Sequence, residues 1–225
     1  MASTKKPALI FDLDGVLVYT DKFHFAAWKK MGQNHGITVD TSLDSKLRGV
    51  SRMESLSIIL NYNELDFPEE KKKTLADEKN GYYNELLGGL STDDMVAGSL
   101  EFVREAREAG HEMAVASSSK NADTVLSALG IASYFSAVVT GHDISRTKPD
   151  PQIFQLAGER LGRGSEECIV FEDAVSGIEA AKAAQMQAIY VAPQGSTVPE
   201  NLDADTVIYG FADLRLEELL KRLGR

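Results

Sequence analysis

Short apolar runs alternate with longer segments of helical periodicity along most of the chain. Strands are expected at 8–11, 113–116, 137–139, 169–171, 188–191 and near 206–209. Runs of this length that are apolar throughout indicate strands buried on both faces. Helices are expected between and after them at 98–109, 121–129, 150–161, 174–185 and 213–223. Strands that alternate with helices in this way predict βαβ units and a parallel sheet.

A block without a convincing strand follows the first strand. Helical spacing places four of its residues on one helix face: Asp21, His24, Trp28 and Met31. Further helices are expected at 51–61 and 68–87. We therefore predict an α/β protein with a Rossmann-like parallel sheet core, formed by residues 1–18 and 90–225. An inserted all-helical cap domain, residues 19–89, is expected to set substrate specificity.

Composition and charge narrow the class of protein. The 225 residues are 43% hydrophobic and 26% charged, which is typical of a globular protein. A formal net charge of −10 argues against nucleic acid or an anionic membrane as partner, because both bind basic surfaces. No apolar run approaches the roughly 20 residues of a membrane span, and the run before Asp12 is too short for a signal peptide. Cys168 is the single cysteine, which excludes an intramolecular disulfide and fits a reducing compartment. We expect a soluble, cytoplasmic protein, and we expect it to be a monomer.

Side chains that can bind ions stand after four of the predicted strands. They are Asp12 and Asp14, Ser117–Ser119, Lys148, and Glu172 with Asp173. Ligands of an open α/β sheet bind beyond the carboxyl ends of its strands, so these segments are expected to meet at one edge. An ionised carboxylate is costly to bury there without a metal, a proton or a charged partner.

Carboxylates, hydroxyls and one amine would therefore share this edge. Clustered carboxylate oxygens with no histidine or cysteine nearby suit a hard cation such as Mg²⁺. The serines precede Lys120 and Asn121 at a predicted helix start, where free backbone N–H groups favour an anion. A metal, a lysine and a helix start around a carboxylate nucleophile predict phosphoryl transfer through an aspartyl-phosphate.

Four segments resemble, in order, the four motifs of the haloacid dehalogenase-like superfamily. They are Phe11–Leu17, Ser117, Lys148–Pro149 and Phe171–Asp173, and they span essentially the whole chain. The resemblance implies that Asp12 is the nucleophile and Asp14 the general acid/base. It also implies that Ser117 and Lys148 bind the transferring phosphoryl group.

The same resemblance implies a magnesium site beside the nucleophile. Its expected ligands are Asp12, Asp173 and the backbone carbonyl of Asp14, with Glu172 contributing directly or through water. The implied cofactor is therefore Mg²⁺.

Segments of the predicted cap narrow the resemblance to the β-phosphoglucomutase branch of this superfamily. The implied substrate-binding residues are His24, Trp28, Arg48, Gly49, Val50, Ser51, Arg52, Lys79, Asn80, Ser118, Ser119, Lys120 and Asn121. That branch interconverts β-D-glucose 1-phosphate and D-glucose 6-phosphate, with β-glucose 1,6-bisphosphate as intermediate and activator. A bisphosphate has two anionic ends, so a mutase needs a second phosphate site, for which Arg52 offers a bidentate fork. His24 would orient Asp14 or bind the sugar.

Simpler interpretations exist for several of these residues. His24 and Trp28 can be helix-packing residues, and Lys79 can be one more lysine on an exposed helix. Arg48 and Arg52 can lie on a solvated surface. Gly177, with Ser176, is interpreted as part of a helix start.

The reaction also has alternatives. A sugar-phosphate phosphatase would use the same Asp12 but transfer the phosphoryl group to water. A haloacid dehalogenase leaves Asp14 without an evident role. A catalytically dead binding or regulatory protein would be expected to lack Asp12, Asp14 or Lys148, and all three are present. The mutase is the preferred hypothesis, because a simple phosphatase does not require a distal phosphate site.

Overall fold

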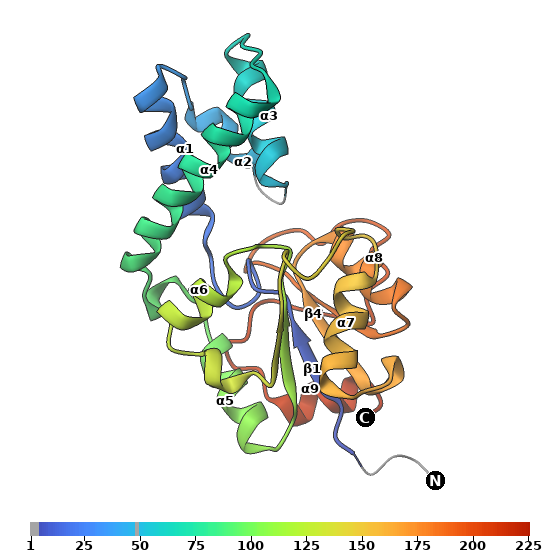
Figure 1. Ribbon diagram of the computed structural model, residues 1–225. Helices are drawn as coiled ribbons and strands as arrows, with labels where there is room; N and C mark the ends of the chain where they lie inside the picture. Colours follow the sequence, from blue (N-terminus) through green and yellow to red (C-terminus); the bar gives the residue numbers. More distant parts are fainter. Residues whose placement is uncertain (1–4, 48–49) are drawn as a thin grey trace. The chain divides into compact units, whose positions relative to one another are not determined.

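The chain folds into two compact units, residues 1–19 with 91–225 and residues 20–90. A computed structural model describes residues 5–47 and 50–225 (Figure 1). The first unit is an α/β unit built on a sheet, and the second is a helical unit.

A parallel sheet forms the α/β unit. In spatial order, its strands within the described residues are β3 (Ala137–Val139), β2 (Met113–Ala116), β1 (Ala8–Phe11), β4 (Cys168–Glu172), β5 (Gln187–Val191) and β6 (Thr206–Ile208). Every neighbouring pair is parallel. This is the order of a doubly wound Rossmann-like sheet, in which β2 and β3 are added on one side of β1 and β4 to β6 on the other. The predicted fold class is confirmed.

The central strand β1 is buried on both faces. All four of its residues are completely buried. Ala8 and Ile10 belong to a core shared with α7 (Gln152–Leu161) and α8 (Val175–Ala183). Phe11 faces the other way, where its ring stacks on Phe171 with 4.6 Å between centroids. Two buried faces explain why the sequence of this strand is apolar without alternation.

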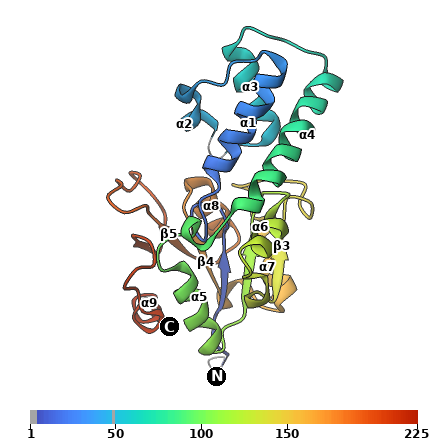
Figure 2. The ribbon, with the colours of Figure 1, turned by 90° about the vertical axis from the view of Figure 1, so that its left-hand side faces the viewer.

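Helices α5 (Ser99–Glu108) and α9 (Leu216–Arg222) contact one another (Figure 2). The remaining helix of the unit, α6 (Ala122–Ala128), follows β2. The helix expected at 213–223 starts three residues late, because Asp213 has a φ of +62° and the backbone of Arg215 is extended, both outside the helical region. The helix expected at 150–161 starts at Gln152, directly after Pro151.

The helical unit has its own hydrophobic core. It contains α1 (Asp21–His35), α2 (Asp44–Leu47), α3 (Arg52–Tyr62) and α4 (Glu69–Leu86), of which the short α2 was not predicted. Helices α1 and α4 lie side by side (Figures 1 and 2). Trp28, Met31, Leu56 and Leu75 are among the buried core residues. Across the described residues, no helix has the length and apolar character needed to span a membrane.

Candidate active site

The carboxyl ends of the central strands meet at one edge of the sheet. Strand β1 pairs with β2 and β4 in a register that places Phe11 opposite Phe171. The backbone N–H of Asp12 donates to the carbonyl of Phe171 at 2.9 Å. The N–H of Ser117 donates to the carbonyl of Val139, the last residue of β3, at 3.0 Å. The structure therefore brings together segments more than 100 residues apart in the sequence, at the edge where the sequence places its chemistry.

Lys148 joins two of these segments. Its Nζ donates to Oδ1 of Asp12 and, at 2.5 Å, to Oε1 of Glu172. All three side chains are at most 10% exposed. Burial alone would lower the pKa of Lys148, but the two carboxylates raise it above its ordinary value. Lys148 therefore carries a proton and a positive charge against the Asp12 carboxylate.

The acidic side chains are more numerous than the charge of Lys148 can balance. Burial raises the pKa of Asp12, with further contributions from Glu172 and Asp14, although Lys148 opposes the shift. Burial and the charges of Asp12 and Glu172 raise the pKa of Asp173 to about 8. Such shifts show that burial, together with the neighbouring carboxylates, disfavours the ionised forms of Asp12 and Asp173 more than Lys148 favours them. They also fit a functional site, where perturbed groups gather.

The donor set fits a hard divalent cation. Carboxylate oxygens are the ligands that Mg²⁺ prefers, and a dication would favour the ionised forms of Asp12 and Asp173, which burial and mutual repulsion disfavour. Among the described residues, no three acidic, histidine or cysteine side chains already form a metal cage. The expected set does not need one, because it uses the backbone carbonyl of Asp14 beside two carboxylates.

The turn after β1 is shaped around Asp173. Gly15 has a φ of +81°, which glycine adopts without strain. A Cβ on Gly15 would lie 1.9 Å from Oδ2 of Asp173. The N–H of Gly15 donates to the carbonyl of Val18 at 2.9 Å and closes the turn. Gly15 thus lets the backbone beside Asp14 approach the Asp173 carboxylate.

The segment after β2 forms a compact loop. The N–H of Ser119 donates to Oγ of Ser117 at 3.1 Å, and the N–H of Asn121 donates to Oγ of Ser119 at 3.2 Å. Each hydroxyl that accepts in this way still has its own proton to donate. Ser117 and Asn121 are buried, whereas Ser118 and Lys120 are exposed. The loop therefore presents hydroxyl and amine donors suited to an anion.

Gly141, a residue that sequence reasoning missed, supports this loop. Its N–H donates to the carbonyl of Ser119 at 3.2 Å. A Cβ at this position would lie 2.3 Å from the backbone oxygen of Ser118. Only a glycine permits so close an approach between the loops after β2 and β3. One sequence alone does not distinguish this glycine from an ordinary turn glycine.

In the helical unit, the buried Lys79 contacts the partly buried His24. Nζ of Lys79 lies 2.7 Å from Nδ1 of His24, and Lys79 is 2% exposed. The interpretation of Lys79 as a lysine on an exposed helix is therefore wrong. An ammonium group can only donate, so Nδ1 accepts and the imidazole proton is assigned to Nε2. Burial and the charges of Lys79 and Arg52 lower the pKa of His24 to about 3.

Aromatic rings complete this pair. The Lys79 ammonium lies 5.0 Å from the centroid of Trp28 and 4.9 Å from that of Tyr83. Tyr83 also stacks on His24, with centroids 4.0 Å apart and 8° between the planes. Trp28 belongs to the helical core, so the packing interpretation of this residue is confirmed, while its role toward substrate stays a prediction. Tyr83 was missed, although its spacing of four residues from Lys79 places it on the same helix face.

Arg52 lies at the start of α3. One of its guanidinium nitrogens, Nη2, donates to Oδ1 of Asn80 at 2.7 Å. Nη1 lies 3.8 Å from Oδ1 of Asp77, and the Arg52 side chain is 28% exposed. Ser51 caps the helix through a bond from the N–H of Glu54. The guanidinium group of Arg52 is therefore held in place by hydrogen bonding, while part of the side chain is exposed to solvent.

Three predicted residues lie beside Ser51 in the sequence. Val50 is partly buried. Arg48 and Gly49 lie outside the described residues, so their roles remain predictions.

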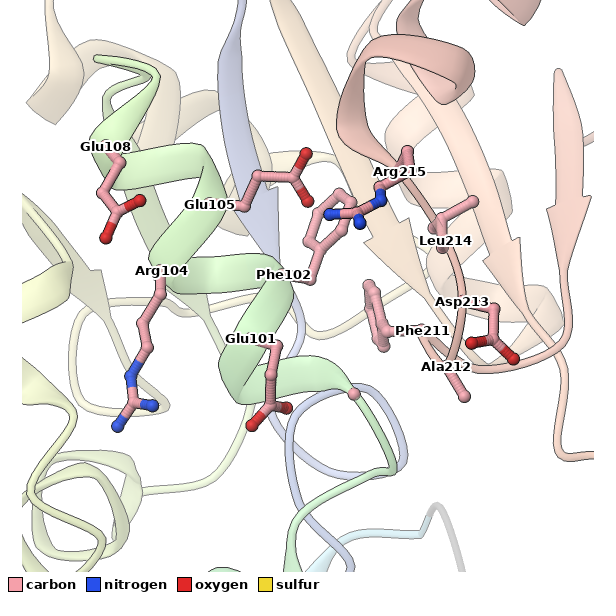
Figure 3. Close-up of a pocket in the computed structure, with 11 residues that line it drawn as sticks. Glu101, Phe102, Arg104, Glu105, Glu108, Phe211, Ala212, Asp213, Leu214 and Arg215 are labelled. Carbon is pink, nitrogen blue, oxygen red and sulfur yellow. The ribbon is translucent and has the colours of Figure 1, made fainter.

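A surface hollow lies elsewhere on the α/β unit, between α5 and the segment before α9 (Figure 3). It has a volume of about 550 Å³ and includes Phe102 and Phe211 among its lining residues. Its lining residues also include Glu101, Glu105, Arg104 and Arg215. None of the residues predicted for the site lines it. We therefore locate the candidate active site at the strand ends.

Comparisons with known proteins point to one family and two activities. A family model of haloacid dehalogenase-like hydrolases matches residues 6–185. The β-phosphoglucomutase of Bacillus subtilis is 36% identical over 214 residues, covering 94% of this chain and 93% of that protein. The phosphorylated carbohydrates phosphatase of Thermotoga maritima is 36% identical over 186 residues, covering 81% and 83%. The crystal structure of a β-phosphoglucomutase from Clostridium difficile has a TM-score of 0.84 and 34% identity, covering 98% of both chains.

Proposed function

The chain belongs to the haloacid dehalogenase-like hydrolase family, and we propose that it interconverts β-D-glucose 1-phosphate and D-glucose 6-phosphate. Its similarity to β-phosphoglucomutases over nearly its whole length supports this proposal. The proposal depends mainly on the state of Arg52. Its guanidinium is hydrogen-bonded to Asn80 and is still partly exposed, so it can bind a second phosphate. A phosphatase that binds one phosphate needs no second cationic group of this kind.

In this proposal, Asp12 is the nucleophile and carries the phosphoryl group between the half-reactions. The phosphorylated Asp12 gives its phosphoryl group to the 6-hydroxyl of β-glucose 1-phosphate, and Asp14 takes the hydroxyl proton. The product is β-glucose 1,6-bisphosphate. A carboxylate oxygen of Asp12 then attacks the phosphorus of the phosphate group on C1. The bond between that phosphorus and the C1 oxygen of the sugar breaks. Asp14 returns its proton to that oxygen and glucose 6-phosphate leaves.

The side chains around Asp12 stabilise the transferring group. Lys148 offsets the charge that develops on the phosphoryl oxygens, and Ser117 donates a hydrogen bond to one of them. Mg²⁺ held by Asp12, Asp173 and the Asp14 carbonyl, with Glu172 direct or through water, would supply further positive charge there. These groups serve a mutase and a phosphatase equally.

Recognition of the second phosphate distinguishes the two activities. We propose that Arg52 binds it, together with Ser119, Lys120 and Asn121. We further propose that His24 donates from Nε2 to an oxygen of the substrate or of Asp14. Because its pKa is about 3, His24 is neutral at pH 7 and acts as a donor rather than as an acid.

A sugar-phosphate phosphatase is the second candidate, since a relative of equal identity carries that name. In that reaction, water replaces the sugar hydroxyl as acceptor and inorganic phosphate is released. Both reactions begin at the same Asp12. They are separated by their products.

Phosphorus NMR tests the proposal directly. The protein is mixed with Mg²⁺, β-glucose 1-phosphate and a trace of β-glucose 1,6-bisphosphate. We expect glucose 6-phosphate to accumulate, and we expect Asp12→Asn to abolish the conversion. Asp203→Asn, the same change at an exposed carboxylate, is the control. Release of inorganic phosphate without glucose 6-phosphate would refute the mutase and support the phosphatase.

A further inference from the structure

A glycine in the first turn of α8 lies against the Glu172 carboxylate. Gly177 is the third residue of that helix (Figure 1). A Cβ built on Gly177 would lie 1.9 Å from Cδ of Glu172 and 2.0 Å from its Oε1. Real atoms do not approach so closely. We propose that Gly177 is a positioning residue, whose missing side chain leaves the space that the Glu172 carboxylate occupies.

Two hydrogen bonds and burial fix the position of the Glu172 carboxylate. Oε1 of Glu172 accepts from Lys148 at 2.5 Å, and Oε2 accepts from the N–H of Ala174 at 2.8 Å. The Glu172 side chain is 2% exposed. A Cβ at Gly177 would also lie 2.4 Å from Oε2, so any shift that admits it displaces both oxygens and weakens both hydrogen bonds.

The backbone gives no other reason for a glycine here. Gly177 lies within a helix, and its φ is not in the left-handed range. Alanine is favoured over glycine in a helix by about 0.5–1 kcal/mol. On helix propensity alone, alanine would therefore be the better residue. Position 177 therefore requires glycine because a side chain there would occupy the space of the Glu172 carboxylate.

The consequence reaches the nucleophile through Lys148. Lys148 is held between Glu172 and Asp12, so moving one carboxylate changes how the lysine meets the other. The inference rests on the proposed function only in that Asp12 performs the reaction. It holds for a mutase and for a phosphatase alike.

A double-mutant cycle between Gly177 and Glu172 is the test. The variants are Gly177→Ala, Glu172→Asp and the two combined, with Gly81→Ala as control. Gly81 also lies inside a helix, and a Cβ there would meet nothing within 4 Å. Hydrolysis of a small phosphate ester and turnover of β-glucose 1-phosphate are both measured, beside thermal unfolding.

We expect Gly177→Ala to lower kcat/KM for both substrates by about 10- to 100-fold, as for a reacting group displaced by about 1 Å. The unfolding temperature should fall by only a few degrees, because the gain in helix propensity offsets part of the cost of the weakened hydrogen bonds. The shorter side chain of Glu172→Asp withdraws the carboxylate from the Cβ, so the added alanine should do little further harm. An equal loss from Gly177→Ala in both backgrounds, or no loss in the wild-type background, would overturn the proposal.

The amide resonance of Ala174 gives a readout that needs no activity. Its hydrogen bond to Glu172 should weaken in Gly177→Ala, which moves the proton resonance upfield and speeds its exchange. Gly81→Ala should leave it unchanged. An unmoved Ala174 resonance in Gly177→Ala would refute the inference. Release of phosphate in place of sugar isomerisation would refute only the mutase.

Discussion

Two lysines, one in each unit, are buried in opposite kinds of surroundings. Lys148 lies against the carboxylates of Asp12 and Glu172. Lys79 donates to the imidazole of His24 and faces the rings of Trp28 and Tyr83. In the α/β unit, the positive charge of Lys148 pairs with the negative charges of two carboxylates. Any phosphoryl transfer through an aspartate needs groups of this kind. In the helical unit, the ammonium meets neutral, polarisable groups and selects one tautomer of a histidine.

This difference suggests a division of labour. On the proposed function, the ionic cluster of Lys148, Asp12 and Glu172 would prepare Asp12 for attack whatever the rest of the substrate is. The helical unit offers donors whose geometry can distinguish one sugar phosphate from another. Three predictions test this comparison.

Lys148→Met should have the largest effect. It leaves the carboxylates of Asp12 and Glu172 without their shared cation, and it removes a charge from the phosphoryl site. We expect kcat/KM to fall by about 10³-fold for a small phosphate ester and for the sugar phosphate alike. Lys182→Met breaks an ion pair with Asp205 away from the site and should keep full activity. A loss confined to the sugar phosphate would contradict the division of labour.

Arg52→Ala should have a smaller and more selective effect. Losing a charged hydrogen-bond donor costs about 1.5–3 kcal/mol, or about 10- to 100-fold in rate. The loss should appear in mutase turnover and not in hydrolysis of a small phosphate ester. Lys72→Ala removes a positive charge elsewhere in the same unit and serves as the control. Equal losses on both substrates would argue against a distal phosphate role.

The pH dependence of stability should show the smallest effect. The pKa of His24 is about 3 when folded, against about 6.5 when unfolded, so the unfolded chain binds its proton first. Folding stability from this group is complete above pH 6.5 and is lost as pH falls toward 3. Between pH 7.5 and 5, the wild type should lose about 2 kcal/mol more than His24→Asn, which does not titrate.

Urea unfolding at several pH values measures the difference. Asparagine keeps an oxygen that can accept from Lys79, so the comparison isolates the titration of His24. His142→Asn, at an exposed histidine, should follow the wild type. Parallel curves for wild type and His24→Asn would mean that Lys79 and burial do not hold His24 neutral.

The sequence predicted the structure best where complete burial produces a continuous run of apolar residues. The apolar runs of β1 and β2 predicted those strands to the residue, because both faces of each are buried. The bounds of β3 were also predicted, although two of its three residues are only partly buried. Once the sheet is parallel, its strand ends must share an edge, which is why Asp12 and Lys148 could be grouped in advance. The late start of α9 could not be predicted, since it depends on the backbone conformations of Asp213 and Arg215.

The supporting residues were not predictable from one sequence. Gly141 and Gly177 matter because another part of the chain comes within 2.3 Å of where a Cβ would be. That distance depends on the packed fold and leaves no mark on the local pattern. Tyr83 has helical spacing from Lys79, but spacing alone does not separate a ring that stacks on a histidine from an ordinary core tyrosine.

The two connections to the helical unit are hydrogen-bonded to each other within the α/β unit. The N–H of Tyr19 donates to the carbonyl of Asp94 at 2.9 Å, and the N–H of Val96 donates to that of Leu17 at 3.0 Å. Val18 and Met95 form an antiparallel bridge between them. An engineer could therefore cut the chain at two points about one strand spacing apart, about 5 Å. A turn or a foreign helical module could be grafted there without redesigning the sheet.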